Sequence, residues 1–354
     1  MRILTILSFL LSAISGFSQI NYELVWADEF DGNGAIDNNN WFHQTQIPAG
    51  GNWYNGEIQH YTNREINSNQ SNGTLKIVAK KGEFTDQGYT KQYTSARLNS
   101  KAAFTYGRFE IRAKLPFGVG TWPAIWTLGK NINEPGGYWT DTFGTANWPA
   151  CGEIDIMEHW GGNQNFIQSA IHTPSSFGGT INLGGQNISN VSTEFHIYEM
   201  EWTSEEMIFS VDGIVHYTYN PPIKNQNTWP FDADQYILLN VAILPDIIPT
   251  AFTESSLEID YVRVYQEVIL GTSDLANLTN IEFTNPVDET LVIKITGKLT
   301  GSMVQIYDLL GKQLYAGQLK SEHTTIDASS FTKGIYILKV QSADGIITKK
   351  IVKR

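Results

Sequence analysis

Hydrophobic and polar residues alternate in short runs along most of the chain, and glycine, asparagine, aspartate or proline bounds each run. A period of two, with many β-branched and aromatic residues, predicts β-strands. Asp212-Gly213 between two such runs predicts a two-residue hairpin turn. No long stretch has the helical period. The clearest runs lie at 73–81, 106–116, 166–173, 206–219, 236–244 and 257–266. Many short strands without a βαβ rhythm predict an all-β fold, a curved antiparallel β-sandwich of the jelly-roll type.

The composition changes near residue 270. All ten tryptophans lie between Trp26 and Trp229. From Ile269 onward the chain has 10 basic and 8 acidic residues, against 14 and 28 before it. We interpret 268–278 as a linker and 279–354 as a small second β-sandwich domain, with Asp344-Gly345 as its last hairpin turn.

The first residues resemble a cleavable signal peptide. Arg2 precedes an apolar stretch from Ile3 to about Ile14, and Gly16 and Ser18 are small residues before the expected cleavage. The apolar stretch is shorter than the roughly 20 residues that a membrane span needs. We therefore expect residues 1–18 to be a signal peptide and 19–267 to form the first domain of the mature protein.

Charge and cysteine content exclude several classes of function. The formal net charge is −12, which disfavours binding to nucleic acid and favours a neutral or weakly charged partner. Cys151 is the single cysteine, so neither an intrachain disulfide nor a cysteine zinc cluster can form.

The segment CGEIDIMEHWG (151–161) carries three carboxylates in an otherwise apolar strand pattern. Glu153 and Asp155 are two apart and share one face of a strand. Glu158 is five residues after Glu153, an odd offset that would send it to the opposite face. A β-bulge near Met157 adds one residue and returns Glu158 to the face of the other two.

The spacing of this segment alone is compatible with three interpretations. With the bulge, the two glutamate Cα atoms would lie roughly 13 Å apart along the strand. Inclined side chains would bring their carboxylates to about 5–6 Å, near the spacing of a retaining glycosidase. In that case one glutamate attacks and the other donates a proton, with Asp155 assisting. The alternatives are a calcium ligand set and a solvated acidic face, which the flanking tryptophans, proline and glycine disfavour.

The same segment resembles the active-site strand of glycoside hydrolase family 16. Further segments similar to that family are WADEFDG (26–32), NGEIQHYT (55–62), YTSARLNSK (93–101), YGRFEIRAKLPFGVGTWPAIWTLG (106–129), FHIYEMEW (195–202) and IDYVRVYQ (259–266). The resemblance implies a concanavalin A-like sandwich with an open concave cleft. It implies that Glu153 is the nucleophile, Asp155 its assistant and Glu158 the acid/base. Because the nucleophile must be ionised and the acid protonated, we expect a low pKa for Glu153 and a raised pKa for Glu158.

The resemblance also implies which side chains contact a glycan. Trp122 and Trp126 are four apart and share one face of an extended chain. The family pattern adds Arg97 and His172 near the cleavage point and Asn55 in NGEIQHYT. We interpret four tryptophans as loop platforms, namely Trp53, Trp139, Trp148 and Trp160, with Trp148 and Trp160 as substrate contacts. Trp26, Trp41 and Trp202 are expected in the core.

Within the family, the presence of the extra residue Met157 makes the segment similar to that of laminarinases, agarases and carrageenases. WPACGEIDIMEHWG is most similar to endo-1,3-β-glucanases. Two features depart from that pattern. Many laminarinases carry a second asparagine at the position of Gly56, and a Gly-Gly-x-Trp loop after LNVA is absent here. We therefore expect an endo-acting β-1,3-glucanase, with laminarin or mixed-linkage 1,3-1,4-glucan as substrate. The alternatives are hydrolysis of another polysaccharide such as agar or carrageenan, and a non-catalytic, lectin-like sandwich.

Catalysis of this kind needs no cofactor, but family members often bind a structural calcium on the convex side. The matching positions are Glu29, a backbone oxygen near Gly73, and Asp260. Two carboxylates and a carbonyl form the all-oxygen ligand set that calcium prefers. The alternative is that these are ordinary surface acids.

The tail resembles the C-terminal sorting domain of type IX secretion. The similarity rests on Asn285-Pro286, VQIYDLLGK, IDASSFTKGIYILKV and the basic end KKIVKR. It implies export through the periplasm and outer membrane, with the secretion machinery as partner, so that the protein is secreted or held at the cell surface. We expect the protein to be a monomer. A small carbohydrate-binding or spacer module is the alternative, which the lack of tryptophan disfavours.

Overall fold

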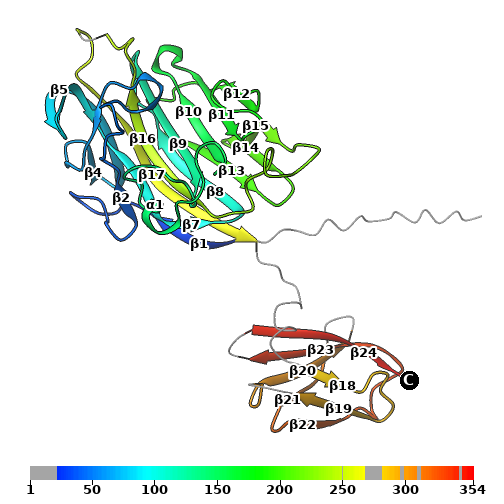
Figure 1. Cartoon of the computed structure of the whole chain (residues 1–354). Helices are drawn as coiled ribbons and strands as arrows, with labels where there is room; N and C mark the ends of the chain where they lie inside the picture. The colour runs from blue at the N-terminus through cyan, green and yellow to red at the C-terminus, as the bar shows by residue number, and fades with distance from the viewer. Residues whose placement is uncertain (1–21, 249, 268–280, 296–298, 309–311, 343–344) are drawn as a thin grey trace, which may run out of the picture. The chain divides into compact units, whose positions relative to one another are not determined.

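The computed structural model describes residues 22–248, 250–267, 281–295, 299–308, 312–342 and 345–354. The chain divides into two compact units, Met1–Val268 and Ile269–Arg354 (Figure 1). The expected signal peptide (1–18) and linker (268–278) lie outside the described residues. No helix among the described residues is long and apolar enough to cross a membrane.

The first unit contains two large sheets, one of them ten-stranded. Its pairs are antiparallel except β3 with β6. In spatial order its strands are β15 (Ile214–Tyr219), β14 (Met207–Val211), β13 (His196–Trp202), β8 (Gly107–Lys114), β17 (Glu254–Glu267), β5 (Thr74–Asp86), β6 (Tyr89–Ser95) and β3 (His60–Tyr61), with β1 (Tyr22–Asp28) paired to β17 and β4 (Ser68–Ser71) to β5.

The second sheet of this unit has seven strands and holds the acidic segment near its middle. In spatial order they are β12 (Leu183–Asn187), β11 (Phe166–His172), β10 (Glu153–His159), β9 (Thr121–Gly129), β16 (Gln235–Ile243), β7 (Arg97–Phe104) and β2 (Trp41–His43). Helical structure among the described residues is confined to α1 (Thr140–Phe143) and the 3₁₀ turns η1 (Tyr54–Gly56) and η2 (Gly161–Asn163).

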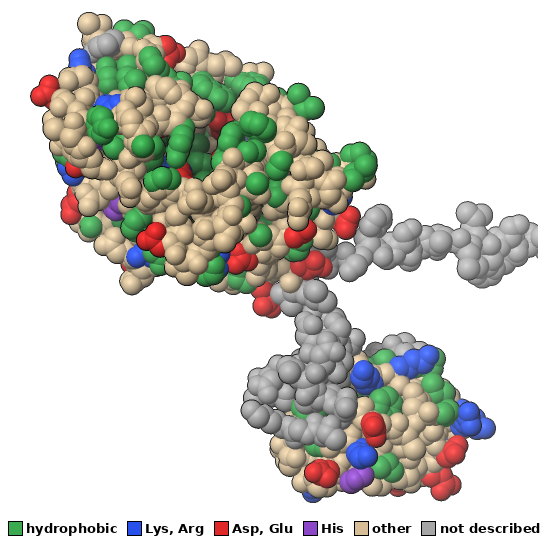
Figure 2. All heavy atoms as spheres, viewed as in Figure 1, with side chains coloured by type: hydrophobic (Ala, Val, Ile, Leu, Met, Phe, Trp, Pro, Cys, Tyr) green, Lys and Arg blue, Asp and Glu red, His purple; other side chains and the backbone are tan. Residues whose placement is uncertain are grey.

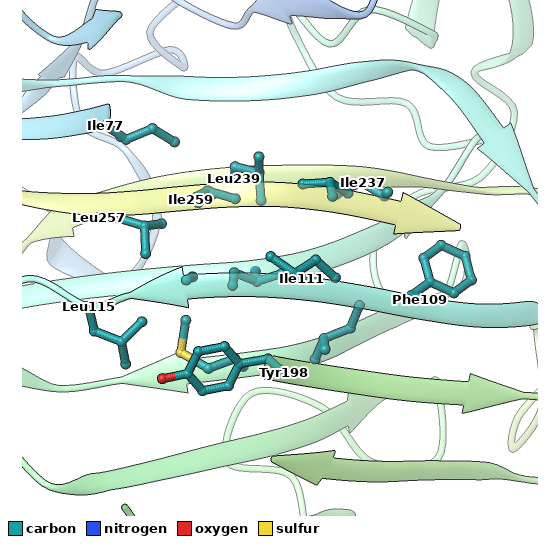
Figure 3. Packing of buried hydrophobic residues seen from close by; sticks show 14 of the residues in the cluster. Ile77, Phe109, Ile111, Leu115, Tyr198, Ile237, Leu239, Leu257 and Ile259 are labelled. Atoms are coloured by element: carbon teal, nitrogen blue, oxygen red, sulfur yellow. The ribbon is translucent and has the colours of Figure 1, made fainter. Parts of the chain in front are cut away.

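The core of this unit lies between the two sheets. Ile237 and Leu239 of β16 face a layer from β5, β8 and β17 that includes Ile77, Ile111 and Ile259 (Figure 3). All five side chains are fully buried. Each strand contributes alternate apolar residues to this layer, so its other residues face outward. The predicted antiparallel sandwich is confirmed, and Trp41 and Trp202 belong to its core, with Trp26 packed against it.

The C-terminal unit is a small β structure with its own core. One sheet contains β18 (Ile281–Phe283), β19 (Thr290–Ile295) and β22 (His323–Asp327). The other contains β21 (Gln313–Gln318), β20 (Met303–Asp308), β23 (Gly334–Ser342) and β24 (Gly345–Lys353). Leu291, Ile293, Ile306 and Leu338 are among its buried residues. The predicted β-sandwich is confirmed.

Candidate active site

The predicted bulge is present in β10. Against β11, Asp155 pairs with Ala170 and Glu158 with Gln168, so three steps on β10 correspond to two on its neighbour. Against β9 the register shifts between Asp155 and Met157. The extra residue therefore lies at Ile156–Met157, and the odd sequence offset between the two glutamates becomes an even structural one.

Burial explains why the strand adopts this bulge. Ile154, Ile156 and Met157 all belong to the core between the sheets, so two successive side chains point inward at the bulge. Placing both apolar side chains in the core removes them from water. The carboxylates of Glu153, Asp155 and Glu158 are left on the opposite face. They are largely buried there, which rules out the solvated acidic face.

A pocket of about 360 Å³ lies over this face of the seven-stranded sheet. Hydrophobic side chains reach the surface of the larger unit around a hollow (Figure 2). The residues that line the pocket come from β7, β9, β10, β16 and the loops at 54–57, 132–134 and 147–148. They are Tyr54, Asn55, Glu57, Arg97, Trp122, Ala124, Trp126, Leu128, Ile132, Asn133, Glu134, Asn147, Trp148, Glu153, Asp155, Glu158, Asn240 and Ala242.

Glu153 and Asp155 share one histidine neighbour. Trp148 Nε1 donates to Glu153 Oε2 at 3.0 Å. His172 lies directly opposite Glu153 on β11. Its Nε2 is 3.6 Å from Glu153 Oε1 and 3.2 Å from Asp155 Oδ2. His172 therefore reaches the two carboxylates from the neighbouring strand β11 and is not among the residues that line the pocket.

Glu158 is held by neutral donors. Trp122 Nε1 donates to its Oε1 at 3.1 Å. Gln168 Nε2, from β11, lies 3.5 Å from its Oε2, at the limit of a hydrogen bond. Both donors favour the ionised carboxylate, but weakly, because neither carries a charge.

Burial controls the protonation of all three acids. It raises the pKa of Asp155 to about 8. Burial, followed by repulsion from Asp155, raises the pKa of Glu158 to about 8. The same two causes raise the pKa of Glu153 well above its usual range, although His172 and Trp148 oppose them. The raised pKa of Glu158 agrees with the prediction, whereas the low pKa expected for Glu153 is wrong for the free protein.

These raised pKa values predict a pH-dependent stability. A carboxyl whose pKa is higher in the folded state than in the unfolded state binds more protons when folded. Stability from Asp155 is therefore greatest below its unfolded pKa near 4 and falls as the pH rises to about 8. We expect Asp155→Asn to raise the unfolding temperature by several degrees at pH 8 and little at pH 4. Thermal unfolding at several pH values checks this, and Asp246→Asn, an exposed site, is the matched control. An equal effect at both pH values would contradict it.

Trp122 and Trp126 both lie on the pocket wall, as predicted. Trp122 stacks on Trp160 with ring centroids 5.6 Å apart and planes inclined by 23°. Trp160 is not among the pocket-lining residues and supports Trp122 from behind. Trp126 Nε1 donates to Asn240 Oδ1 at 2.7 Å. Hydrogen bonds therefore fix both indoles at the edge and leave ring surface toward the pocket.

Arg97 is buried beneath Trp126. Its Nη2 donates to both carboxylate oxygens of Glu134, at 2.8 and 3.0 Å. Its guanidinium centre is 4.8 Å from the Trp126 ring centroid and 5.6 Å from that of Trp53. Trp53 is buried and packs edge-on against Tyr61, so the prediction of a loop platform is wrong there. Tyr61 and the Arg97 guanidinium pack against the Trp53 ring, so the ring has no exposed surface for a ligand.

Other functional candidates were missed from the sequence. Asn240 Nδ2 donates to Tyr61 Oη at 3.2 Å, and Tyr61 Oη donates to Glu57 Oε2 at 2.8 Å. Gln59 Nε2 donates to the same Glu57 oxygen at 2.7 Å. Glu57 and Asn240 line the pocket, as does Glu134. Glu57 lies two residues after Asn55 in the NGEIQHYT segment. Its place in the same polar segment as Asn55 was the sequence feature that could have predicted its position at the pocket.

The loop tryptophans differ in exposure. Trp148 is 41% exposed and lines the pocket, so its ring is available to a ligand. Asn55 is exposed, lines the pocket and has φ of 55°, in the left-handed region that asparagine tolerates. Trp139 is half-buried, and its Nε1 donates to the Ser100 carbonyl at 3.2 Å.

The residues expected to bind calcium already have cationic partners. Both carboxylate oxygens of Glu29 accept hydrogen bonds from Arg263 at 2.8 Å. Asp260 is paired with Arg112. Gly73 lies in the turn between β4 and β5 with φ of 71°. These carboxylates do not fit a calcium ion as they stand, because a cation would have to displace both arginines. Calcium binding therefore stays a prediction.

Sequence comparison gives the family. The model of glycosyl hydrolases family 16 matches residues 55–263. The chain belongs to this family. A β-glucanase from Rhodothermus marinus is 37% identical over 74% of this chain and 94% of that protein. A keratan-sulfate endo-1,4-β-galactosidase from Sphingobacterium multivorum is 31% identical over 72% of this chain and 57% of that protein.

Solved structures support the same family 16 fold. The crystal structure of a LamA variant from Z. galactanivorans, in complex with laminaritriose and laminaritetraose, is 46% identical with a TM-score of 0.65. It covers 70% of this chain and all of that one. The bulged acidic strand thus lies in a family 16 scaffold.

The C-terminal unit has a separate match. The model of the secretion system C-terminal sorting domain matches residues 283–354. The protein therefore carries a sorting domain that directs export by type IX secretion to the cell surface or the extracellular space. The alternative of a carbohydrate-binding tail module is not supported.

Proposed function

We propose that this protein is a secreted endo-β-1,3-glucanase that hydrolyses laminarin-type glucans, including mixed 1,3-1,4 linkages, with retention of configuration. The observation that carries the proposal is the bulge, because it leaves Glu153, Asp155 and Glu158 on one face of a pocket bordered by Trp122 and Trp126. A carboxylate pair beside flat aromatic surface suits a neutral sugar with apolar C–H faces.

The chemistry follows a double displacement. Glu153 in its ionised form attacks the anomeric carbon and forms a glycosyl-enzyme, while Glu158 donates its proton to the leaving glycosidic oxygen. Glu158, now a carboxylate, then takes a proton from water, and this water releases the sugar from Glu153. His172 and Trp148 favour ionisation of Glu153, whereas burial and Asp155 keep a proton on Glu158. Asp155 lies beside both glutamates, and repulsion from its negative charge raises the pKa of each.

Substrate class is the point that needs a direct test. Purified protein would be incubated with laminarin, lichenan, agar, carrageenan and keratan sulfate, and new reducing ends would be measured. We expect the highest rate on laminarin and a mixture of short oligosaccharides as products. Activity on agar or carrageenan with none on laminarin would overturn the glucan assignment. The second candidate, another glycan, is favoured by the similarity to a keratan-sulfate galactosidase.

Trp126 provides a test of the pocket as a sugar site. Its ring borders the pocket and is stiffened by Arg97 and Asn240. We expect Trp126→Ala to raise KM for laminarin by about tenfold, a loss of about 1.4 kcal/mol in binding, because the sugar loses the aromatic face against which its C–H groups pack. Trp139→Ala is the control, since Trp139 does not line the pocket. Equal KM values for the two variants would contradict a sugar-binding role for Trp126.

Removal of the tail separates activity from export. The first unit has its own core and all the described pocket residues. A chain ending near residue 270 should therefore retain the kcat of the full chain but accumulate in the periplasm. Assays of laminarin hydrolysis in cell fractions and medium check both points. Normal release of the shortened protein would contradict the sorting role of residues 283–354.

A further inference from the structure

Glu153, Asp155 and His172 form a donor cluster of a kind that metals bind. One ligand atom from each lies within 4.8 Å of the others. Among the residues that the structure describes, this is the one group of three or more histidine, cysteine or acidic side chains with such spacing. Two of its members are paired across β10 and β11, so sheet hydrogen bonds fix their separation.

The distances fit a tetrahedral ion. Metal–ligand bonds of about 2.0–2.1 Å in a tetrahedral zinc site separate neighbouring ligand atoms by about 3.3 Å. His172 Nε2 lies 3.2 Å from Asp155 Oδ2 and 3.6 Å from Glu153 Oε1. These two separations suit an ion bound by His172 and the two carboxylates, and the three ligand atoms all lie within 4.8 Å of one another.

A second observation also indicates a ligand. Asp155 is 4% exposed, and its Oδ2 makes no hydrogen bond of acceptable geometry. His172 Nε2 lies 3.2 Å away without forming a hydrogen bond. A buried carboxylate oxygen that makes no hydrogen bond is costly, and a bound cation would remove that cost. Glu153 lines the pocket, so an ion held there can be reached from solvent and can keep a water as its fourth ligand.

We propose that the cluster of Glu153, Asp155 and His172 binds Zn²⁺ and that the bound ion inhibits the enzyme reversibly. One imidazole with two carboxylates is a zinc ligand set, whereas calcium prefers oxygen ligands alone. The ion would occupy the oxygen of Glu153 that otherwise attacks the anomeric carbon. Two carboxylates and one divalent ion also give a neutral buried group. The inhibition part rests on the proposed function, and the binding part does not.

The expected affinity is moderate. His172 Nδ1 is buried and makes no hydrogen bond. Zinc-binding histidines usually donate their other ring nitrogen to a carboxylate or carbonyl, and loss of such a partner weakens metal binding by about 10–100-fold. The site is therefore suited to an exchangeable ion rather than a permanent structural one.

Calorimetric titration of the full-length protein with ZnCl₂ tests binding without any substrate. We expect one site of micromolar affinity. His172→Ala and Asp155→Asn should each weaken binding at least tenfold. His196→Ala is the matched control, because His196 also pairs with a carboxylate, Asp212, at 2.7 Å but outside the pocket. Co²⁺ used in place of Zn²⁺ should give the visible absorption of a tetrahedral complex in the wild type and not in His172→Ala.

Inhibition is then measured on laminarin. Zinc should act competitively, and EDTA should restore the rate. Undiminished zinc binding in both His172→Ala and Asp155→Asn, or no binding by the wild type up to millimolar zinc, would overturn the metal site. Zinc binding by a protein that hydrolyses no glycan would instead refute the proposed function and leave the site standing. Folding of each variant is checked by its unfolding temperature.

Discussion

Glu153→Gln should lower kcat on laminarin on the order of 10⁴-fold or more, because the amide cannot form the glycosyl-enzyme. The side chain is similar in size, and Trp148 Nε1 can still donate to the amide oxygen that replaces Oε2. The variant should therefore fold and retain bound oligosaccharide. Replacing a buried acid by an amide also removes like-charge repulsion with Asp155, so the unfolding temperature should not fall.

Steady-state hydrolysis and oligosaccharide titration of the same preparation separate these effects. Glu254→Gln is the control, since Glu254 lies on β17, is 52% exposed and pairs with Lys80 at the surface. It should have wild-type turnover. A Glu153→Gln protein that hydrolyses laminarin at the normal rate would be evidence for another nucleophile, or for binding without the proposed chemistry.

The second large effect concerns the pH dependence of catalysis. Glu158 must be protonated to donate to the leaving oxygen, so activity is present below its pKa and is lost as the pH rises through about 8. Glu153 must be ionised, which produces a second, acidic limb. The burial and the repulsion from Asp155 that raise the pKa of Glu153 move this limb to higher pH. Because the three acids interact, the two limbs report the cluster and not single residues. We expect a bell-shaped profile of kcat/KM whose alkaline side falls near pH 8.

Glu158→Gln should remove the alkaline limb and reduce hydrolysis of laminarin by about 10²–10⁴-fold. An aryl glucoside with an acidic phenol as leaving group needs no proton, so its rate of cleavage should fall much less. Measurement of both substrates between pH 4 and 9 checks this. An unchanged alkaline limb in Glu158→Gln would assign that limb to another group.

The bulge was predictable because it is a local matter of parity and polarity. Two acids on one face, a third at an odd offset and two adjacent apolar side chains leave one solution in an amphipathic strand. The runs in which hydrophobic and polar residues alternate likewise predicted the strands, because alternate residues enter a core that lies on one side of each sheet.

Other parts of the site depend on contacts distant in sequence. His172 faces Glu153 through the register of β10 with β11, which no local pattern specifies. Trp53 is buried because Tyr61 and Arg97 pack against it. The raised pKa of Glu153 follows from burial beside Asp155, and the family role suggested the opposite.

The bulge also changes how this strand tolerates a change in length. Loss of one codon in a β-strand usually inverts every later side chain relative to the sheet. At Met157 the missing residue would be the surplus one. A shortened strand could pair regularly with β9 and β11, and all three acids would still face the same way. A deletion of one residue at this point is therefore compatible with the arrangement of the reacting groups, whereas the same deletion in a regular strand would separate them.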